Sequence, residues 1–210
     1  MPVTMPDSDA TVPPKIVLAS ASATRARLLA AAGVPVETHP AAIDEDEIKI
    51  SLRGAKATSA AAAETLAEIK AQTVSRRCPG RLVVGADQVL DCDEEWFDKP
   101  ADLKQARAQL GRLRGRRHEL ISSAMVVQDG VRLWHHTARA ALTMRPFSDA
   151  FLDSYLAAAG PGVCASVGAY QLEGLGAQLF ARVEGDYFTI LGLPLLPLLA
   201  FLRDRDALPS

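Results

Sequence analysis

Short apolar runs alternate with helix-like segments along this chain of 210 residues, and that order constrains the fold more than any other feature. Residues 15–20, 34–39 and 82–90 have the length and apolar composition of buried or extended strands. Between them, segments 24–33 and 58–75 carry apolar residues at helical spacing. This alternation is typical of α/β proteins, in which helices cover the faces of a sheet.

The second half of the chain adds a hairpin, which predicts a mixed sheet. Asp129-Gly130, a strong two-residue turn signal, lies between the strand-like runs 118–127 and 131–144. A further strand is expected at 177–183, after a glycine-rich stretch. No internal repeat and no Pro/Gly linker divides the chain, so the fold class is α/β with a mixed sheet. Helices are predicted from Asp102 as a cap to about Gly115, after the cap Ser148, and over residues 193–203.

The two ends of the chain carry no targeting or spanning signal. Residues 1–14 contain two acids and no Lys or Arg, so they lack the basic start of a signal peptide and are expected to be a disordered lead-in. The domain proper is predicted over 15–205. The longest apolar stretch, 190–202, is shorter than the roughly 20 residues of a membrane span and contains Pro194 and Pro197. No membrane partner is predicted.

The charge and cysteine content exclude several classes of protein. The net charge of −2 argues against a dedicated nucleic-acid binder, which carries a basic excess. Cys78, Cys92 and Cys164 are odd in number and widely spaced, which fits a cytoplasmic protein without disulfides or a thiolate zinc site. The five arginines within 107–117 are interpreted as a solvated helix end, where cations complement the helix dipole and no aromatic residues lie between them to stack on bases. Nucleic-acid binding through these arginines stays an alternative.

Two local features could carry chemistry. Ser20, Ser22 and Arg25 lie where a strand passes into a helix, which suits either an anion cradle or an ordinary serine-capped helix. Asp87 lies inside an apolar strand run, where a carboxylate is costly unless it is paired or holds a metal. The alternative for Asp87 is a structural cap of a turn after Gly85.

The remaining candidates are weaker when taken singly. Lys99 precedes Pro100 and is therefore held extended, as a phosphate-binding or a solvated lysine. Lys70, late in the long helix, is by itself typical of a surface lysine. The acidic run 44–47 is predicted to be a solvated loop. If such a loop faced Asp87, its oxygens would suit Mg²⁺ or Mn²⁺.

Together, these segments resemble the Maf family. The resemblance rests on nine short motifs that follow in the family's order along almost the whole chain. They are residues 16–22 with Arg25 and Leu28-Leu29 (L-A-S-x-S, R, L-L), 43–45 (I-D-E), 66–71 (L-A-x-x-K-A), 85–87 (G-A-D), 99–100 (K-P), 115–119 (G-x-x-H-x), 168–170 (G-A-Y), 173–176 (E-G-x-G) and 192–195 (G-L-P-L).

The resemblance implies a nucleoside triphosphate pyrophosphatase that cleaves between the α and β phosphates to give a nucleoside monophosphate and pyrophosphate. It also implies an elongated mixed sheet flanked by helices, with two lobes around a deep nucleotide cleft as in inosine triphosphatases, and a homodimer. The implied roles are Asp87 as general base, Glu45 with Asp87 as ligands of a divalent metal (Mg²⁺ or Mn²⁺), and a triphosphate-binding set of Ser20, Ser22, Arg25, Lys70 and Lys99.

Three positions bear on base selection. Gln88 and Glu173 are similar to the branch of the family that acts on 7-methyl-GTP, whereas Thr24 stands where that branch has Trp. A carboxylate at Glu173 can accept from guanine N1–H and N2, and it complements a methylated, positively charged base. A guanine-like or 7-methyl-GTP preference is therefore predicted. The alternative function is a non-catalytic, nucleotide-binding regulator of cell division and septum formation.

Overall fold

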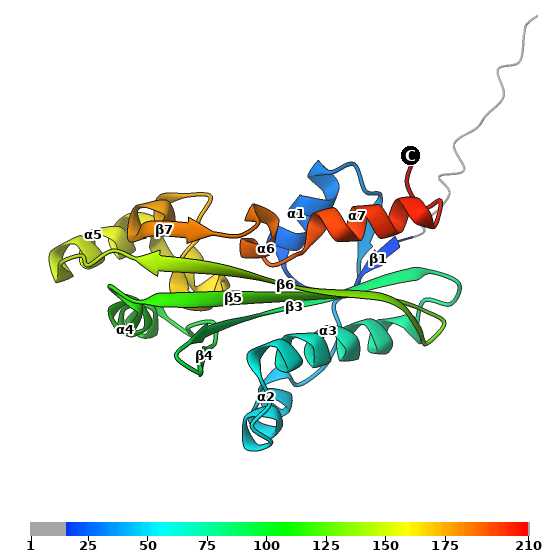
Figure 1. Ribbon diagram of the computed structural model, residues 1–210, viewed down its shortest axis with the longest axis horizontal. Helices are drawn as coiled ribbons and strands as arrows, with labels where there is room; N and C mark the ends of the chain where they lie inside the picture. The colour runs from blue at the N-terminus through cyan, green and yellow to red at the C-terminus, as the bar shows by residue number, and fades with distance from the viewer. Residues whose placement is uncertain (1–15, 210) are drawn as a thin grey trace, which may run out of the picture.

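The computed structural model describes residues 16–209; the predicted lead-in over 1–14 lies outside this range. One seven-stranded sheet runs through the molecule in the order β2-β1-β3-β5-β6-β7, with β4 paired to β3 beside this path (Figure 1). The strands β1 and β2, and β1 and β3, are parallel, and the remaining pairs are antiparallel, which confirms the predicted mixed sheet. The strands are β1 Ile16–Leu18, β2 Val36–Thr38, β3 Leu82–Cys92, β4 Glu95–Phe97, β5 Arg117–Gln128, β6 Val131–Met144 and β7 Phe180–Glu184.

Three long strands, β3, β5 and β6, make the molecule elongated (Figure 1). The turn between β5 and β6 is formed by Asp129 and Gly130, whose φ angles of 50° and 79° suit a tight hairpin. The predicted hairpin is confirmed. On the other side of β3, β1 pairs with only the first residues of that strand and β2 pairs with β1, so each end of β3 belongs to a different part of the fold.

Helices cover both faces of the sheet (Figure 1). The predicted side-chain caps at Asp102 and Ser148 are present, and each accepts a hydrogen bond from a backbone N–H of the following helix. Short 3-10 turns occupy the glycine-rich stretch. The α-helices are α1 Ala23–Ala31, α2 Glu45–Gly54, α3 Ser59–Ser75, α4 Leu103–Leu113, α5 Asp149–Ala159, α6 Tyr187–Ile190 and α7 Leu195–Asp204; the 3-10 turns are Gly160–Ala165, Val167–Ala169 and Leu175–Leu179.

Two predicted segments differ from the structure. The acidic run 44–47 is not a loop: Asp44 caps α2 by accepting from the backbone N–H of Glu47, and the remaining acids fill its first turn. Carboxylates there interact favourably with the positive end of the helix dipole. The strand predicted over 177–183 begins only at Phe180, because the preceding residues continue a 3-10 turn.

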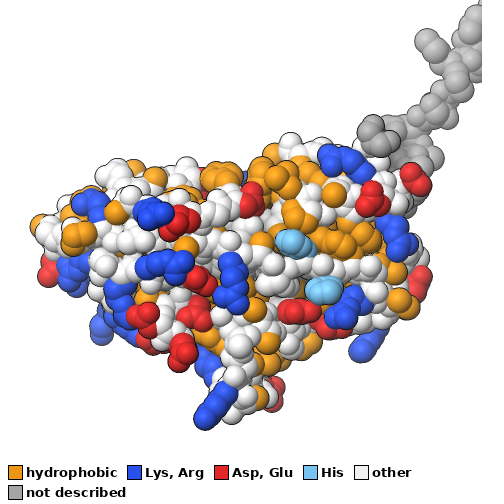
Figure 2. All heavy atoms as spheres, viewed as in Figure 1, with side chains coloured by type: hydrophobic (Ala, Val, Ile, Leu, Met, Phe, Trp, Pro, Cys, Tyr) orange, Lys and Arg blue, Asp and Glu red, His pale blue; other side chains and the backbone are white. Residues whose placement is uncertain are grey.

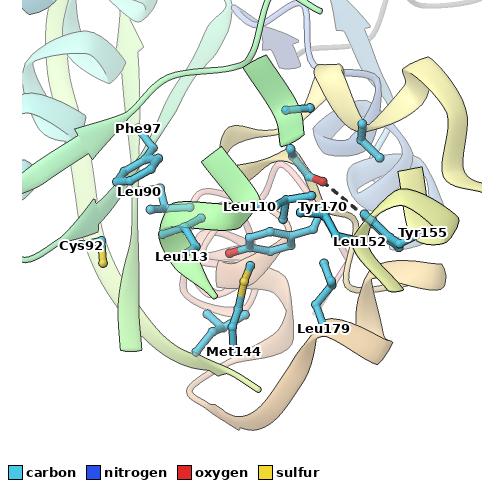
Figure 3. Packing of buried hydrophobic residues seen from close by; sticks show 14 of the residues in the cluster. Leu90, Cys92, Phe97, Leu110, Leu113, Met144, Leu152, Tyr155, Tyr170 and Leu179 are labelled. Atoms are coloured by element: carbon cyan, nitrogen blue, oxygen red, sulfur yellow. Dashed lines mark hydrogen bonds between the residues drawn. The ribbon is translucent and has the colours of Figure 1, made fainter. Parts of the chain in front are cut away.

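The buried side chains form two main clusters, one for each lobe. One lies around β1, α1 and α7. The other fills the space between the far halves of β3, β5 and β6 and helices α4 and α5 (Figure 3). In this second cluster, Tyr155 donates a hydrogen bond from its hydroxyl to the carbonyl of Ala169, at 3.3 Å. The predicted two-lobed architecture is confirmed. Within residues 16–209, no helix is both long and apolar enough to cross a membrane.

Candidate active site

A cleft of about 820 Å³ opens between the lobes. It is bordered by the turn before α1, the start of α2, helix α3, the middle of β3 and two loop segments from the second half of the chain, 165–173 and 190–192. All the residues that the sequence predicted for the site line this one cleft. They are Ser20, Ser22, Thr24, Arg25, Glu45, Lys70, Asp87, Gln88, Lys99 and Glu173.

Lys70 joins two carboxylates on the floor of the cleft. Its Nζ donates to Asp87 Oδ1 at 2.6 Å and lies 2.8 Å from Glu45 Oε1. Lys70 and Asp87 are both 5% exposed, whereas Glu45 is half-buried. Taken alone, Lys70 was predicted to be a surface lysine, and this is wrong: the side of α3 that carries it packs against the sheet.

Close packing of α3 on β3 brings the ion pair together. Gly85 lies on β3 where the helix crosses, and a Cβ atom there would be 2.8 Å from the Cβ of Ala71. Only glycine leaves room for so close an approach. Asp87, two residues further, points to the same face of the strand and so meets Lys70, the neighbour of Ala71. Asp87 lies in mid-strand opposite Ser123, which rules out the turn-cap alternative.

Arg25 is buried and held by the protein through two of its nitrogens. Its Nε donates to the carbonyl of Gly192 at 2.8 Å, and its Nη1 donates to Ser20 Oγ at 3.0 Å and to the carbonyl of Ala86 at 2.9 Å. Ser22 caps α1 by accepting from the backbone N–H of Arg25 at 3.4 Å. The turn is thus a serine-capped helix start and, at the same time, a wall of the cleft.

The charges of the cleft perturb one another. Burial alone would raise the pKa of Glu45, but Lys70 and the more distant Lys49 and Lys99 outweigh it, so that the pKa lies below its usual value. Desolvation lowers the pKa of Arg25, against the opposing effect of Asp87 and Glu45. Desolvation also lowers the pKa of Lys99, and Arg25 lowers it further. These cations share one region that favours a polyanion.

The three residues predicted to select the nucleotide base line the cleft, but they differ in how firmly the protein holds their side chains. Gln88 is fixed: its Nε2 donates to Ser122 Oγ at 2.9 Å and to the carbonyls of Thr189 and Ile190 at 3.0 and 3.1 Å. Only its Oε1 is available to a ligand. Thr24 and Glu173 are less constrained and share one neighbour, Arg27, whose Nη2 lies 3.3 Å from Thr24 Oγ1 and 4.0 Å from Glu173 Oε1.

The donor set for a metal is small. Within residues 16–209, no three His, Cys, Asp or Glu side chains are grouped so as to hold an ion on their own. Asp87 Oδ2, however, is buried without a hydrogen-bond partner among the described residues. That free oxygen, with Glu45 at the cleft, fits the common Mg²⁺ arrangement in which one or two carboxylates are completed by water and substrate phosphates.

Two further charged residues of the cleft were not found from the sequence. Lys49, on α2, donates from Nζ to Asp98 Oδ1 at 2.8 Å, and both residues line the cleft. Lys49 follows Glu45 by four residues, which is one helical turn and therefore one face. That spacing was a usable signal, but it has meaning only in a helix, and the acidic run before it was taken for a loop.

The arginines of residues 107–117 lie at a different place. They surround the end of α4 and the start of β5, where Lys and Arg side chains alternate with Asp and Glu on the surface (Figure 2). Each is neutralised by a neighbouring acid, as expected of a solvated helix end. The pairs are Arg107 with Asp153, Arg112 with Glu95, Arg114 with Asp149, Arg116 with Asp93 and Arg117 with Glu119.

Comparison with known proteins gives consistent matches. Residues 15–205 match the family described as Maf-like protein. The chain is 58% identical over 192 residues to a nucleoside triphosphate pyrophosphatase of Paramagnetospirillum magneticum, covering 91% of this chain and 99% of that protein. It is 52% identical to one of Granulibacter bethesdensis, covering 92% and 98%. It is 49% identical to a 7-methyl-GTP pyrophosphatase of Rhizobium johnstonii, covering 93% and 98%.

Proposed function

The chain belongs to the family of Maf-like proteins, and we propose that its cleft binds a nucleoside triphosphate and hydrolyses it between the α and β phosphates. The products are a nucleoside monophosphate and pyrophosphate. The observation that carries this proposal is the state of Asp87: a buried carboxylate with one oxygen held by Lys70 and the other free, in a cleft bordered by cations.

Asp87 is the general base. Its Oδ2 accepts a proton from the attacking water as the water oxygen bonds to the α-phosphorus, while the bond from that phosphorus to the bridging oxygen breaks and pyrophosphate departs. Lys70 fixes the other oxygen and so sets the orientation of the carboxylate. A pure nucleotide-binding regulator has no need of such an oriented, partly unpartnered carboxylate, which favours catalysis over that alternative.

The triphosphate is held by four groups of the cleft, which are Arg25, Lys70, Lys99 and the turn of Ser20 and Ser22. Negative charge builds on the phosphoryl oxygens and the leaving group during the reaction, so preorganised cations stabilise the transition state. Arg25 contributes Nη2, because Nε and Nη1 are committed to protein acceptors. The first backbone N–H groups of α1, next to Ser22, add the positive end of a helix dipole.

Glu45 and Asp87 would hold a divalent metal, Mg²⁺ or Mn²⁺. When bound, such an ion supplies charge neutralisation of the phosphates and a lowered pKa of bound water. The single free oxygen of Asp87 and the half-buried carboxylate of Glu45 leave most of the coordination sphere to water and substrate, as Mg²⁺ prefers.

The nucleotide base that the cleft selects is guanine-like. Glu173, on the rim, can accept two hydrogen bonds from guanine N1–H and N2, and it offers no donor to the O4 of thymine or uracil. Gln88 presents only its Oε1, another acceptor. Relatives named 7-methyl-GTP pyrophosphatase, at 49% and 50% identity, support selection of that base. Thr24 supplies no aromatic face for a cationic base, so GTP and 7-methyl-GTP are both included.

A nucleotide panel tests the proposal. The full chain is assayed with Mg²⁺ and with Mn²⁺ on GTP, 7-methyl-GTP, dTTP and UTP, and the release of pyrophosphate and phosphate is measured separately. We expect pyrophosphate as the first product and faster turnover of the two guanine nucleotides. Phosphate as the first product would contradict α–β cleavage, and a clear preference for dTTP or UTP would contradict the base assignment.

Replacement of the general base, Asp87, adds a second test in the same assay. Asp87→Asn keeps the shape of the side chain and is expected to lower kcat by about 10³-fold, the scale of a lost general base. Nucleotide binding should persist, since the cations are unchanged. Full activity in this variant would remove Asp87 from the mechanism. A wild-type protein that binds nucleotide and never turns it over would favour the regulator.

The proposal extends to assembly and location. The protein is a cytoplasmic homodimer that binds nucleotides and not nucleic acids; the paired arginines of residues 107–117 support the last point. Light scattering of the purified chain tests the dimer by its mass, for which the monomer has 22.4 kDa.

A further inference from the structure

Helix α2 is attached to the body of the protein by Leu52, which packs on a buried apolar cluster, and by polar contacts. It lies beside α3 at the margin of the molecule, and none of its residues is buried (Figure 1). Asp98, in the segment between β4 and α4, binds two of its cations. Lys49 Nζ lies 2.8 Å from Asp98 Oδ1, and Arg53 Nη2 lies 2.8 Å from Asp98 Oδ2.

The two cations of this cluster face different surroundings. Lys49 lines the cleft and its side chain is 14% exposed, whereas Arg53 lies outside the cleft and is 40% exposed. Arg53 has further contacts, because its guanidinium stacks over the ring of Trp96, 5.4 Å from the centroid, and donates to the Trp96 carbonyl at 3.5 Å. Lys49 has Asp98 as its one hydrogen-bond partner among the described residues.

This arrangement allows Lys49 to change partners at low cost. If Lys49 turns from Asp98 to an anion in the cleft, the Asp98 carboxylate keeps its pair with Arg53 and is not left unpaired. A lysine side chain, with a flexible stem and three donors, suits such a move. An unpaired carboxylate would otherwise oppose the exchange.

The order of contacts indicates which part of the substrate Lys49 meets. From Asp87, the chain of groups passes to Lys70, then to Glu45, and one helical turn along α2 to Lys49. Asp87 holds the attacking water, and in-line displacement places the leaving group on the far side of the α-phosphorus from that water. We infer that Lys49 binds the β and γ phosphates, the part of the substrate that leaves as pyrophosphate; this inference rests on the proposed function.

Inorganic pyrophosphate and the nucleoside monophosphate are suitable probes, because each product occupies the binding site on one side of the α–β phosphate bond that is cleaved. Their inhibition constants and the steady-state kinetics are measured for the wild type, for Lys49→Met and for the matched control Arg53→Met, which removes the other cation of Asp98. We expect Lys49→Met to raise the inhibition constant of pyrophosphate about tenfold and KM severalfold, with the monophosphate constant unchanged. Lys49→Arg, which keeps the charge, restores most of the affinity.

The possible results separate this inference from the proposed function. Arg53→Met should raise the inhibition constant of pyrophosphate by only about twofold, because the half-exposed Asp98 is partly solvated by water when it loses its pair, and it should leave the monophosphate constant unchanged. Equal effects of Lys49→Met and Arg53→Met on pyrophosphate would mean that both act by holding α2, which overturns the role of Lys49 while the activity stands. Unchanged pyrophosphate inhibition in Lys49→Met overturns it as well. A wild type that hydrolyses no triphosphate overturns the proposed function instead.

Discussion

The cleft and the end of the molecule around α4 both collect basic side chains, but they use them in opposite ways. In the cleft, Arg25 and Lys70 are buried and held in place, and Arg25 retains a donor that the protein does not use. Around α4, all five arginines of residues 107–117 are paired with acids at the surface. Such exposed pairs contribute little, since water and salt screen them.

The number of cations in a region therefore says little about whether that region is a binding site. A basic group attracts an anionic ligand when the protein has removed its water, fixed its position and left part of its hydrogen-bonding capacity open. The cleft meets these conditions, whereas the arginines of the surface cluster remain exposed to water and have their charge balanced by acids. Three changes test this contrast.

The largest effect is expected for Lys70→Met. It leaves the buried Asp87 and the half-buried Glu45 without the cation between them, and loss of one partner of a buried pair typically costs about 3 kcal/mol of unfolding free energy. Turnover should fall by about 10²-fold or more, because the orientation of Asp87 is lost. Chemical denaturation and steady-state kinetics measure both.

The control for this variant is Lys104→Met on the exposed face of α4. It should leave unfolding and turnover as in the wild type. If both lysines gave the same small change, burial and pairing would not distinguish the cleft from the surface.

The next effect is on stability alone and comes from His118, a buried side chain near the surface cluster. His118 is 1% exposed, and its Nε2 and the Tyr170 hydroxyl form a hydrogen bond of 2.8 Å. Burial, and to a smaller extent the neighbouring Arg117, lowers the pKa of His118 from 6.5 to about 4. In contrast to Lys70, this group is kept neutral.

The sign of the pH dependence follows. Unfolded His118 takes up a proton below pH 6.5, while the folded protein resists protonation until about pH 4. Its contribution is therefore complete above pH 6.5 and is lost as the pH falls toward 4, by about 3 kcal/mol. Denaturation curves at several pH values should show this slope in the wild type and in His136→Gln, and a weaker slope in His118→Gln. Equal slopes in all three would mean that His118 is protonated in the folded state.

The smallest effect is expected for Arg107→Ala. Arg107 is paired with Asp153 through Nε at 2.7 Å, yet both side chains are about half exposed. kcat/KM should stay within about twofold and the unfolding midpoint should be unchanged. Strong, salt-dependent binding of mixed oligonucleotides by the wild type, lost in this variant, would show that the cluster is a binding surface after all.

Local signals predicted most of the fold. Capping residues such as Asp102 and Ser148 and the Asp129-Gly130 turn act on neighbouring backbone, so their consequences can be deduced from a few adjacent residues. The family resemblance predicted which side chains share the cleft. What the residues alone could not supply is burial: Lys70 looks like any helix-surface lysine until α3 is laid on the sheet.

The parts that escaped prediction depend on contacts across long stretches of chain. Arg25 is held in part by the carbonyl of Gly192, 167 residues away, and no local pattern reveals that hydrogen bond. Lys49 was missed for a simpler reason. A helix start rich in acids has the same composition as a solvated loop, and only the capping hydrogen bond of Asp44 distinguishes the two.

The glycine at position 85 limits how such an enzyme can be redesigned. Because Gly85 brings the backbone of α3 against β3, it sets the distance between the main-chain positions that carry Lys70 and Asp87. Mutagenesis libraries aimed at new nucleotides are best confined to the rim, at Thr24 and Glu173. Position 85 on the floor of the cleft is best left unchanged, because any larger residue there would push α3 from β3 and would move Lys70 away from Asp87.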